Sequence, residues 1–181
     1  MRELKNHEKK LLRKVDLLHW KSTDNIHETQ VMRRYHITKR DDYVKYNKII
    51  GMIHKVSERL SILPLDDTFR REISDQMINK MTEMGFLGTK KGLPGCKNIN
   101  VASVCRRRLA VVMVRLKMSE TVKQAVKLIE QGHVRVGPHC VTDPAFLITR
   151  KMEDHVTWMD QSKIRKKVLM YNDKLDDYDL L

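Results

Sequence analysis

The chain changes its hydrophobic period within one short stretch, which reads Ala125-Val126-Lys127-Leu128-Ile129-Glu130-Gln131-Gly132-His133-Val134-Arg135-Val136-Gly137. Before Gly132 the apolar residues recur at three- and four-residue steps, which is typical of an amphipathic helix. After it, polar and apolar residues alternate, which indicates a half-buried strand. The glycine favours a helix end, because it adopts the left-handed backbone conformation without strain. The stretch therefore predicts a helix that leads into a small sheet, an α+β arrangement.

The sequence on both sides extends this arrangement. The expected elements are a helix over residues 103–117 capped by Ser103, a helix capped by Ser119 that ends at Gly132, a turn at Gly137-Pro138, and strands over residues 133–136, 146–149 and 155–158. Two helices and a small antiparallel sheet would form a domain of residues 103–160.

Residues 1–98 carry a different pattern, in which amphipathic helices follow one another and no strand is indicated. The expected helices cover residues 2–20, 26–36, 41–63 and 67–84. The third begins at Asp41 or Asp42, and the fourth is capped by Asp66 or Asp67 and ends at Gly85. The Gly- and Lys-rich stretch 88–95 lacks the GK[ST] ending of a phosphate-binding loop, and no strand precedes it. We therefore place a domain boundary there, with a helical N-terminal extension at 1–98. Residues 161–181 are expected to form a C-terminal extension with an acidic tail.

Composition restricts the function classes. The 181 residues carry a net charge of +13, with +7 in residues 1–64 and again +7 in residues 99–151. Such a balance attracts polyanions, so nucleic acid is the first candidate partner, an anionic membrane surface the second, and a merely solvated basic surface the alternative to both. No apolar run approaches the ~18 residues of a membrane span, and no secretory signal is evident at the N-terminus. With three cysteines and no CxxC spacing, we expect reduced thiols in an intracellular protein.

The basic residues of the segment 106–135 are the candidate RNA-binding residues. They are Arg106, Arg107, Arg108, Arg115, Lys117, Lys123, Lys127, His133 and Arg135. If residues 103–117 form one helix, the arginines lie outside its apolar face, and packing of two helices and a strand gathers the cations on one rim. The alternative is pairing with Glu120, Glu130 and Asp154, but three acids cannot neutralise this segment. We expect that Arg107→Glu together with Arg108→Glu weakens RNA binding without unfolding the protein.

No catalytic or metal-binding motif is present in the sequence. HExxH, GxSxG and paired Cys/His arrays are all absent. His133, His139 and Cys140 lie close together but lack a fourth ligand, so we expect neither a metal nor a cofactor. The chain is therefore not expected to be an enzyme.

Three segments resemble the S4-type RNA-binding domain. They are Arg106-Arg107-Arg108-Leu109, Arg115-Leu116-Lys117-Met118 and the stretch 125–137 quoted above. The resemblance implies that two helices and a hairpin grip structured RNA through its phosphates and minor groove. This agrees with the physics of A-form RNA, whose deep and narrow major groove is closed to side chains.

Further segments along almost the whole chain are similar to one family within this group, the S4-domain proteins of the U3 small nucleolar ribonucleoprotein, or Imp-three family. They are Leu4-Lys5-Asn6-His7-Glu8-Lys9-Lys10-Leu11-Leu12, Val15-Asp16, Arg33-Arg34-Tyr35, Arg40-Asp41-Asp42-Tyr43, Met152-Glu153-Asp154-His155-Val156-Thr157-Trp158 and Asp176-Asp177-Tyr178-Asp179. The resemblance implies a nucleolar, non-catalytic protein of the small-subunit processome that binds U3 RNA and helps it pair with the ribosomal RNA precursor. The partners it implies are the acidic scaffold M-phase phosphoprotein ten and a Brix-domain protein, beside other processome components.

Two other hypotheses compete with this one. A structural small-subunit ribosomal protein of the S4 family would share the helices and the RNA-binding domain. An RNA-modifying enzyme with an appended S4-type domain would need a catalytic domain, but residues 1–98 contain no aspartate-centred or cofactor motif. Within the chain, the apolar stripe of Leu4, Leu11, Val15 and Leu18 can pack on the rest of the protein or on a partner.

Overall fold

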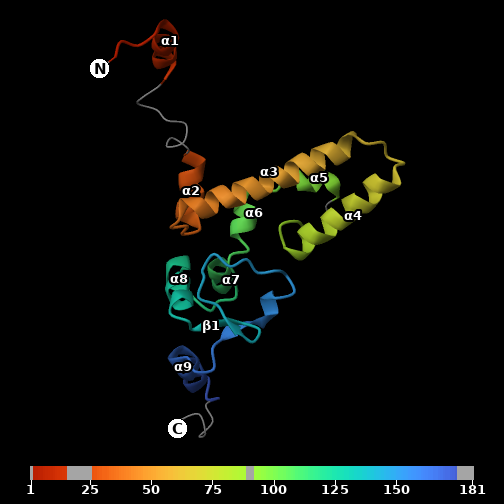
Figure 1. Cartoon of the computed structure of the whole chain (residues 1–181). Coiled ribbons are helices and arrows are strands. Elements are labelled where there is room, and N and C mark those ends of the chain that lie inside the picture. The colour runs from red at the N-terminus through yellow and green to blue at the C-terminus, as the bar shows by residue number, and fades with distance from the viewer. Residues whose placement is uncertain (1, 16–25, 89–91, 175–181) are drawn as a thin grey trace.

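The computed structural model describes residues 2–15, 26–88 and 92–174. In chain order the elements are α1 (Asn6–Lys14), α2 (Ile26–Arg34), α3 (Arg40–Ile62), α4 (Thr68–Glu83), α5 (Leu93–Cys96), α6 (Val101–Cys105), α7 (Leu109–Arg115), α8 (Val122–Glu130), β1 (Val134–Val136), β2 (His139–Cys140), the 3₁₀ helix η1 (Glu153–His155), β3 (Val156–Trp158) and α9 (Lys163–Tyr171). The predicted α+β class is confirmed, with helices first and a small sheet late in the chain (Figure 1).

The long helix α3 organises the N-terminal half. Its apolar residues recur at helical spacing, so one face is buried while the other stays in solvent. In Figure 1, α2 lies at its beginning and α5 beneath its second half. The core on this side combines residues from α2, α3, α5, α6 and the segments between them: Val31, Tyr35, Ile37, Tyr43, Tyr46, Ile50, Ile53, Leu87, Cys96, Ile99, Val101, Val104 and Cys105. Burial raises the pKa of the Cys105 thiol to about 11, so this sulfur stays protonated at neutral pH.

Helix α4 begins and ends as its sequence predicts. The carboxylate of Asp67 accepts a hydrogen bond from the Phe69 amide at 3.0 Å, which caps the first turn. Gly85 follows the last turn with φ +76°, the left-handed conformation of a helix stop.

A second core lies under α7, α8 and the sheet. It contains Leu109, Ala110, Val112, Met113, Ala125, Val126, Ile129, Val134, Val136, Ile148 and Val156. The sheet order is β2-β1-β3 and both pairings are antiparallel, with Val136 opposite His139 on one side and opposite Val156 on the other. Gly137, at φ +60°, supplies the turn of the β1–β2 hairpin.

The structure contradicts two of the expected elements. The predicted helix over residues 103–117 is divided into α6 and α7, because the backbone between them pairs with residues 146–148. The Leu109 amide donates to the Phe146 carbonyl at 2.8 Å, and the Ile148 amide donates to the Arg107 carbonyl at 2.8 Å. For the same reason residues 146–149 do not form a strand of the sheet and make only one bridge, between Arg108 and Leu147.

Smaller differences occur at other points of the domain. Thr121, and not Ser119, caps α8, since its hydroxyl accepts from the Gln124 amide at 3.2 Å. The pairing of β2 with β1 and the short helices α5 and α9 were not predicted. Residues 16–20 of the predicted helix 2–20 lie outside the described residues. Residues 175–181 of the predicted acidic tail also lie outside them.

A close contact at Gly85 joins the two halves of the chain. A Cβ atom at this position would lie 2.9 Å from Cδ and Nε of Arg107, in a backbone conformation that side chains other than glycine rarely adopt. We expect Gly85→Ala to lower the free energy of unfolding by about 1–3 kcal/mol.

The matched control is Gly51→Ala, in the interior of α3, where an added Cβ meets nothing within 4 Å. This variant should gain about 0.5–1 kcal/mol from helix propensity. Urea denaturation followed by circular dichroism measures both, and equal midpoints for Gly85→Ala and the wild type would refute the close contact.

Candidate nucleic-acid interface

The outward face of α8 carries two lysines on consecutive turns. Ala125, Val126 and Ile129 are buried against the core, so Lys123 and Lys127 lie on the opposite, solvent-exposed side. Residues four apart are neighbours on a helix surface, and two cations held there form a site for consecutive or opposed phosphates. The structure therefore exposes both residues to solvent, and their contact with RNA stays a prediction.

Four of the nine predicted RNA-binding residues are exposed cations without a charged partner. Arg106, Lys117, Lys123 and Lys127 are accessible to solvent, and none of them forms an ion pair or side-chain hydrogen bond within the described part of the chain. Lys117 follows α7 in a left-handed conformation, φ +59°. It lines a hollow of about 440 Å³ together with Val114, Met118, Ser119, Glu120 and Gln124.

Three further predicted residues are accessible but are held by neighbours. Arg115 forms an ion pair with Glu153. Arg135 on β1 donates to Thr157 Oγ1 at 3.0 Å and also pairs with Asp160. His133 shares a hydrogen bond of 3.0 Å between its Nδ1 and the Ser162 hydroxyl. An RNA phosphate would have to compete with these partners.

Arg107 and Arg108 are not on the surface, which corrects the prediction for both residues. Their exposed fractions are 4% and 3%. Arg107 donates from Nε to the Ile148 carbonyl at 2.8 Å and from Nη1 to Glu153 at 3.0 Å. Its partner Glu153 also holds Arg115, so one carboxylate orders two guanidinium groups.

Arg108 connects the second core to α3. Its Nη1 donates to the Tyr46 hydroxyl at 3.0 Å and lies 3.7 Å from the Asp42 carboxylate. Burial raises the pKa of the Tyr46 hydroxyl, although the nearby Arg108 lowers it, so the group keeps its proton and donates to the Ala145 carbonyl at 3.5 Å. Arg107 and Arg108 are thus structural residues, because a phosphate in solvent cannot reach them.

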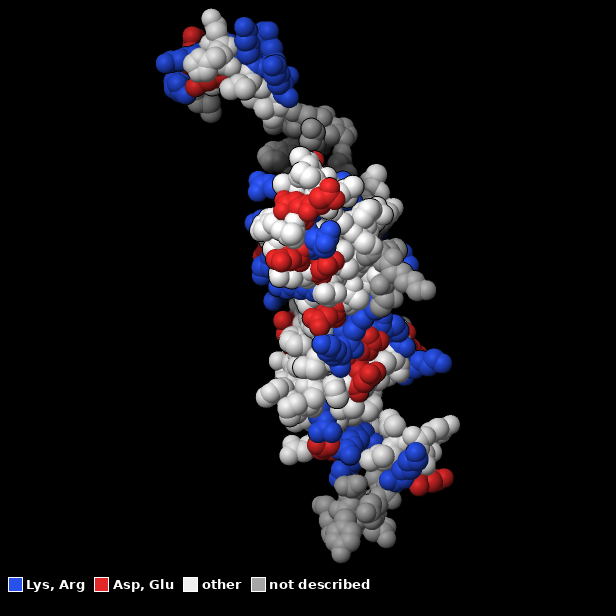
Figure 2. Space-filling view, turned by 90° about the vertical axis from the view of Figure 1, so that its right-hand side faces the viewer, with Lys and Arg blue, Asp and Glu red and all other residues white. Residues whose placement is uncertain are grey.

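Charge is unevenly spread over the visible surface. In Figure 2, α1 is dominated by positive side chains, whereas positive and negative side chains are interspersed over the body below it. Helix α1 carries Lys9, Lys10, Arg13 and Lys14 against the single acid Glu8 and buries no residue. A second positive region therefore exists at the N-terminus, apart from the exposed cations between Arg106 and Lys127.

The described residues contain no group of three or more metal-ligating side chains. Within the same residues, no helix has both the length and the apolar composition needed to cross a bilayer.

Sequence comparison divides the chain into two matched regions. A family profile described as ribosomal protein S4/S9 N-terminal domain matches residues 3–106, and one described as S4 domain matches residues 107–154. The domain boundary near residue 98 stays a prediction.

Full-length relatives identify the family. The chain is 53% identical to the U3 small nucleolar ribonucleoprotein protein IMP3 of Saccharomyces cerevisiae over 180 residues, which cover 99% of this chain and 98% of the yeast protein. It belongs to the IMP3 family. The human IMP3 is 48% identical over 181 residues, with 99% of this chain and 98% of that protein covered. The resemblance to the Imp-three family is thereby confirmed.

A more distant relative is a ribosomal protein. The small ribosomal subunit protein uS4 of Picrophilus torridus is 24% identical over 136 residues, or 75% of this chain and 74% of that protein. The IMP3 relatives share about twice the percentage identity and align over nearly the entire length, so the chain groups with them.

Proposed function

We propose that the chain is a non-catalytic RNA-binding component of the U3 small nucleolar ribonucleoprotein, which binds U3 RNA and promotes its pairing with pre-ribosomal RNA during small-subunit rRNA maturation. The observation that carries the proposal is the set of exposed, uncompensated cations Arg106, Lys117, Lys123 and Lys127 in or beside the S4-matched region. The chain belongs to a family whose members are named as U3 ribonucleoprotein proteins, and this membership suggests U3 RNA as the ligand.

The physical basis of the activity is neutralisation of phosphate charge. Two RNA strands repel each other before they pair, and cations held on a fixed surface lower this repulsion. Stacking contributes less, because α8, which carries Lys123 and Lys127, contains no aromatic residue. Arg115, His133 and Arg135 join the contact only if RNA displaces their present partners.

Protein partners form the second part of the proposal. The family resemblance suggests an acidic scaffold, M-phase phosphoprotein ten, and a Brix-domain companion in the nucleolus. Leu4, Leu11, Leu12 and Val15 of the α1 region are all exposed, Leu11 at 63%, and this apolar stripe surrounded by lysines fits an acidic amphipathic partner.

The proposed function is tested by strand annealing. A fluorescently labelled U3 RNA segment is mixed with its complementary pre-ribosomal RNA segment, with and without the full chain, and duplex formation is followed by gel electrophoresis. We expect the protein to accelerate annealing by about tenfold or more at ~0.1 M salt and to lose this effect as salt rises. A non-complementary RNA pair is the control, and an unchanged annealing rate would contradict the proposal.

A structural ribosomal protein is the second candidate, because the N-terminal profile and uS4 both point to the ribosome. The two candidates differ in the particle they occupy. Sedimentation of cell extract separates them, since a processome protein accompanies only large precursor particles and a ribosomal protein stays with mature small subunits.

A further inference from the structure

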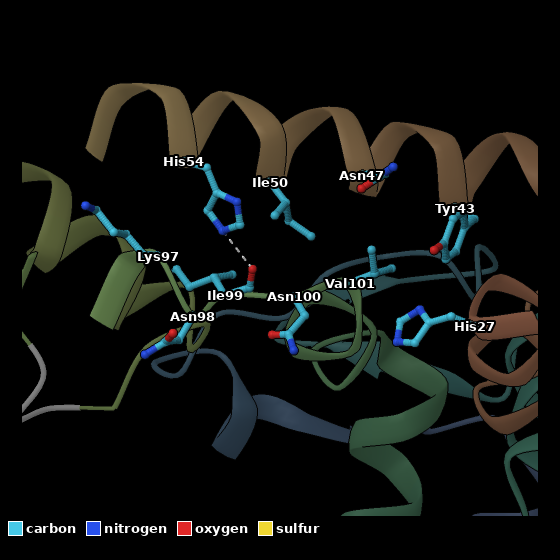
Figure 3. Close-up of a pocket in the computed structure, with 10 residues that line it drawn as sticks. All are labelled: His27, Tyr43, Asn47, Ile50, His54, Lys97, Asn98, Ile99, Asn100 and Val101. Carbon is cyan, nitrogen blue, oxygen red and sulfur yellow. Dashed lines mark hydrogen bonds between the residues drawn. The ribbon is translucent and has the colours of Figure 1, made fainter. Parts of the chain in front are cut away.

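A polar groove runs along one flank of α3, away from the cations of α8. One wall is formed by Tyr43, Asn47, Ile50 and His54, which share a flank of α3, and the other by the segment 97–101 (Figure 3). His27 of α2 lies at one end of the groove. The volume of this open groove is about 520 Å³, within the ~300–1,000 Å³ that ligand sites commonly have.

Three carboxamides dominate the chemistry of the groove. Asn47, Asn98 and Asn100 are exposed, and within the described part of the chain none of their side chains makes a hydrogen bond. Each amide offers two N–H donors and one carbonyl acceptor. A nucleobase edge also presents donors together with acceptors, whereas an isolated phosphate would call only for donors.

A histidine and a lysine complete the lining. The His54 ring is fixed by a 3.0 Å hydrogen bond between Nε2 and the Ile99 carbonyl, as the dashed line in Figure 3 marks. A carbonyl only accepts, so Nε2 carries the proton and Nδ1 of the neutral ring remains an acceptor. Lys97 supplies a positive charge at the rim.

The charge of the groove fits an anionic ligand. No Asp or Glu is among the residues that line it. Glu58 lies beyond it, at a smaller hollow of about 250 Å³ that shares His54 and Lys97. A strand entering between Tyr43 and Lys97 therefore meets amides and a cation, and no carboxylate lines its path.

We infer that this groove takes an unpaired nucleotide of a bound RNA, with its base edge against the asparagine amides and its phosphate beside Lys97. The nucleotide must be unpaired, because pairing occupies the edge that the amides would read. The inference rests on the proposed function, since RNA held by the exposed cations Lys117, Lys123 and Lys127 brings an adjoining single strand to the groove at high local concentration.

The test compares two RNAs with the full chain by fluorescence anisotropy. One is a blunt hairpin from U3 RNA, and the other is the same hairpin with a short single-stranded extension of mixed base composition. We expect the extension to tighten binding about tenfold, equivalent to about 1.4 kcal/mol. Asn47→Ala combined with Asn100→Ala should abolish this gain and leave the affinity for the blunt hairpin unchanged.

The matched control is Asn79→Ala combined with Asn172→Ala, two exposed asparagines on α4 and at the end of α9 that do not line the groove. It should keep the tenfold gain. The inference fails if the extension does not tighten binding, or if the groove variant keeps the tenfold gain in affinity, because the groove then does not hold RNA. Binding of the blunt hairpin would still support the proposed function in either case. If neither hairpin binds the wild type, the proposed function fails as well.

Discussion

Arg107→Glu combined with Arg108→Glu is expected to unfold the chain or to lower its free energy of unfolding by at least about 3–5 kcal/mol, because each change breaks a buried charge interaction. This outcome is the opposite of what the sequence alone predicts, namely weaker RNA binding in a folded protein.

The reason at Arg107 is electrostatic and steric. Its guanidinium lies against Gly85 and Glu153 and donates to the Ile148 carbonyl. A glutamate here would face the Glu153 carboxylate at close range, where burial limits screening by water, and the Ile148 carbonyl would lose a donor.

The reason at Arg108 is the connection between the two cores. Its side chain reaches the Tyr46 hydroxyl and the Asp42 carboxylate of α3 and lies 5.9 Å from the centre of the Tyr46 ring. A glutamate would put two carboxylates together beneath α3, so the packing of α3 on the S4-matched region would be lost first.

The neighbouring residue provides the control. Arg106 is exposed and forms no ion pair within the described residues, so Arg106→Glu should change the stability by no more than about 0.5 kcal/mol. Urea denaturation of the full chain, followed by circular dichroism, measures both variants. A double variant that unfolds at the wild-type urea concentration would show that the two arginines are not buried in solution.

Lys123→Glu combined with Lys127→Glu is expected to weaken binding of U3 RNA by at least about tenfold at ~0.1 M salt while the protein stays folded. Both side chains are exposed on α8 and lie opposite its buried residues, so the substitution removes no core contact. Each reversal replaces an attraction for phosphate with a repulsion.

A control with the same charge change is available on α9. Lys163 and Lys167 are likewise exposed and four residues apart, but they lie outside the matched S4 domain of residues 107–154. Lys163→Glu combined with Lys167→Glu should reduce RNA affinity far less than the α8 variant. An equal loss in both variants would mean that net charge, and not the α8 surface, determines binding.

Local sequence patterns predicted much of the fold. Helices α3, α4 and α8 follow from their apolar spacing, and Gly85 and Gly132 mark the ends of α4 and α8. These features depend on residues within a few positions of each other. The exposure of Lys123 and Lys127 follows in the same way, because both residues lie on the side of α8 that faces away from its apolar residues.

Contacts between distant parts of the chain explain what was missed. The prediction of one helix over residues 103–117 is wrong because residues 146–148 pair with the backbone near Arg107, about forty residues away in sequence. Asp42 lies 3.7 Å from Arg108, but an acid in the first turn of a helix is also favoured by the helix dipole, so it did not signal this partner. The groove along α3 depends equally on segment 97–101, whose position no local pattern gives.

The salt dependence of RNA binding tests most directly whether the exposed cations of α8 hold phosphates. The logarithm of the association constant of U3 RNA is measured against the logarithm of salt concentration for the wild type and for the Lys123→Glu, Lys127→Glu variant. Each lost phosphate contact lowers the slope by about 1, so we predict a slope smaller by about 2 in the variant. Parallel lines for the two proteins would contradict the assignment of the RNA-binding surface to α8.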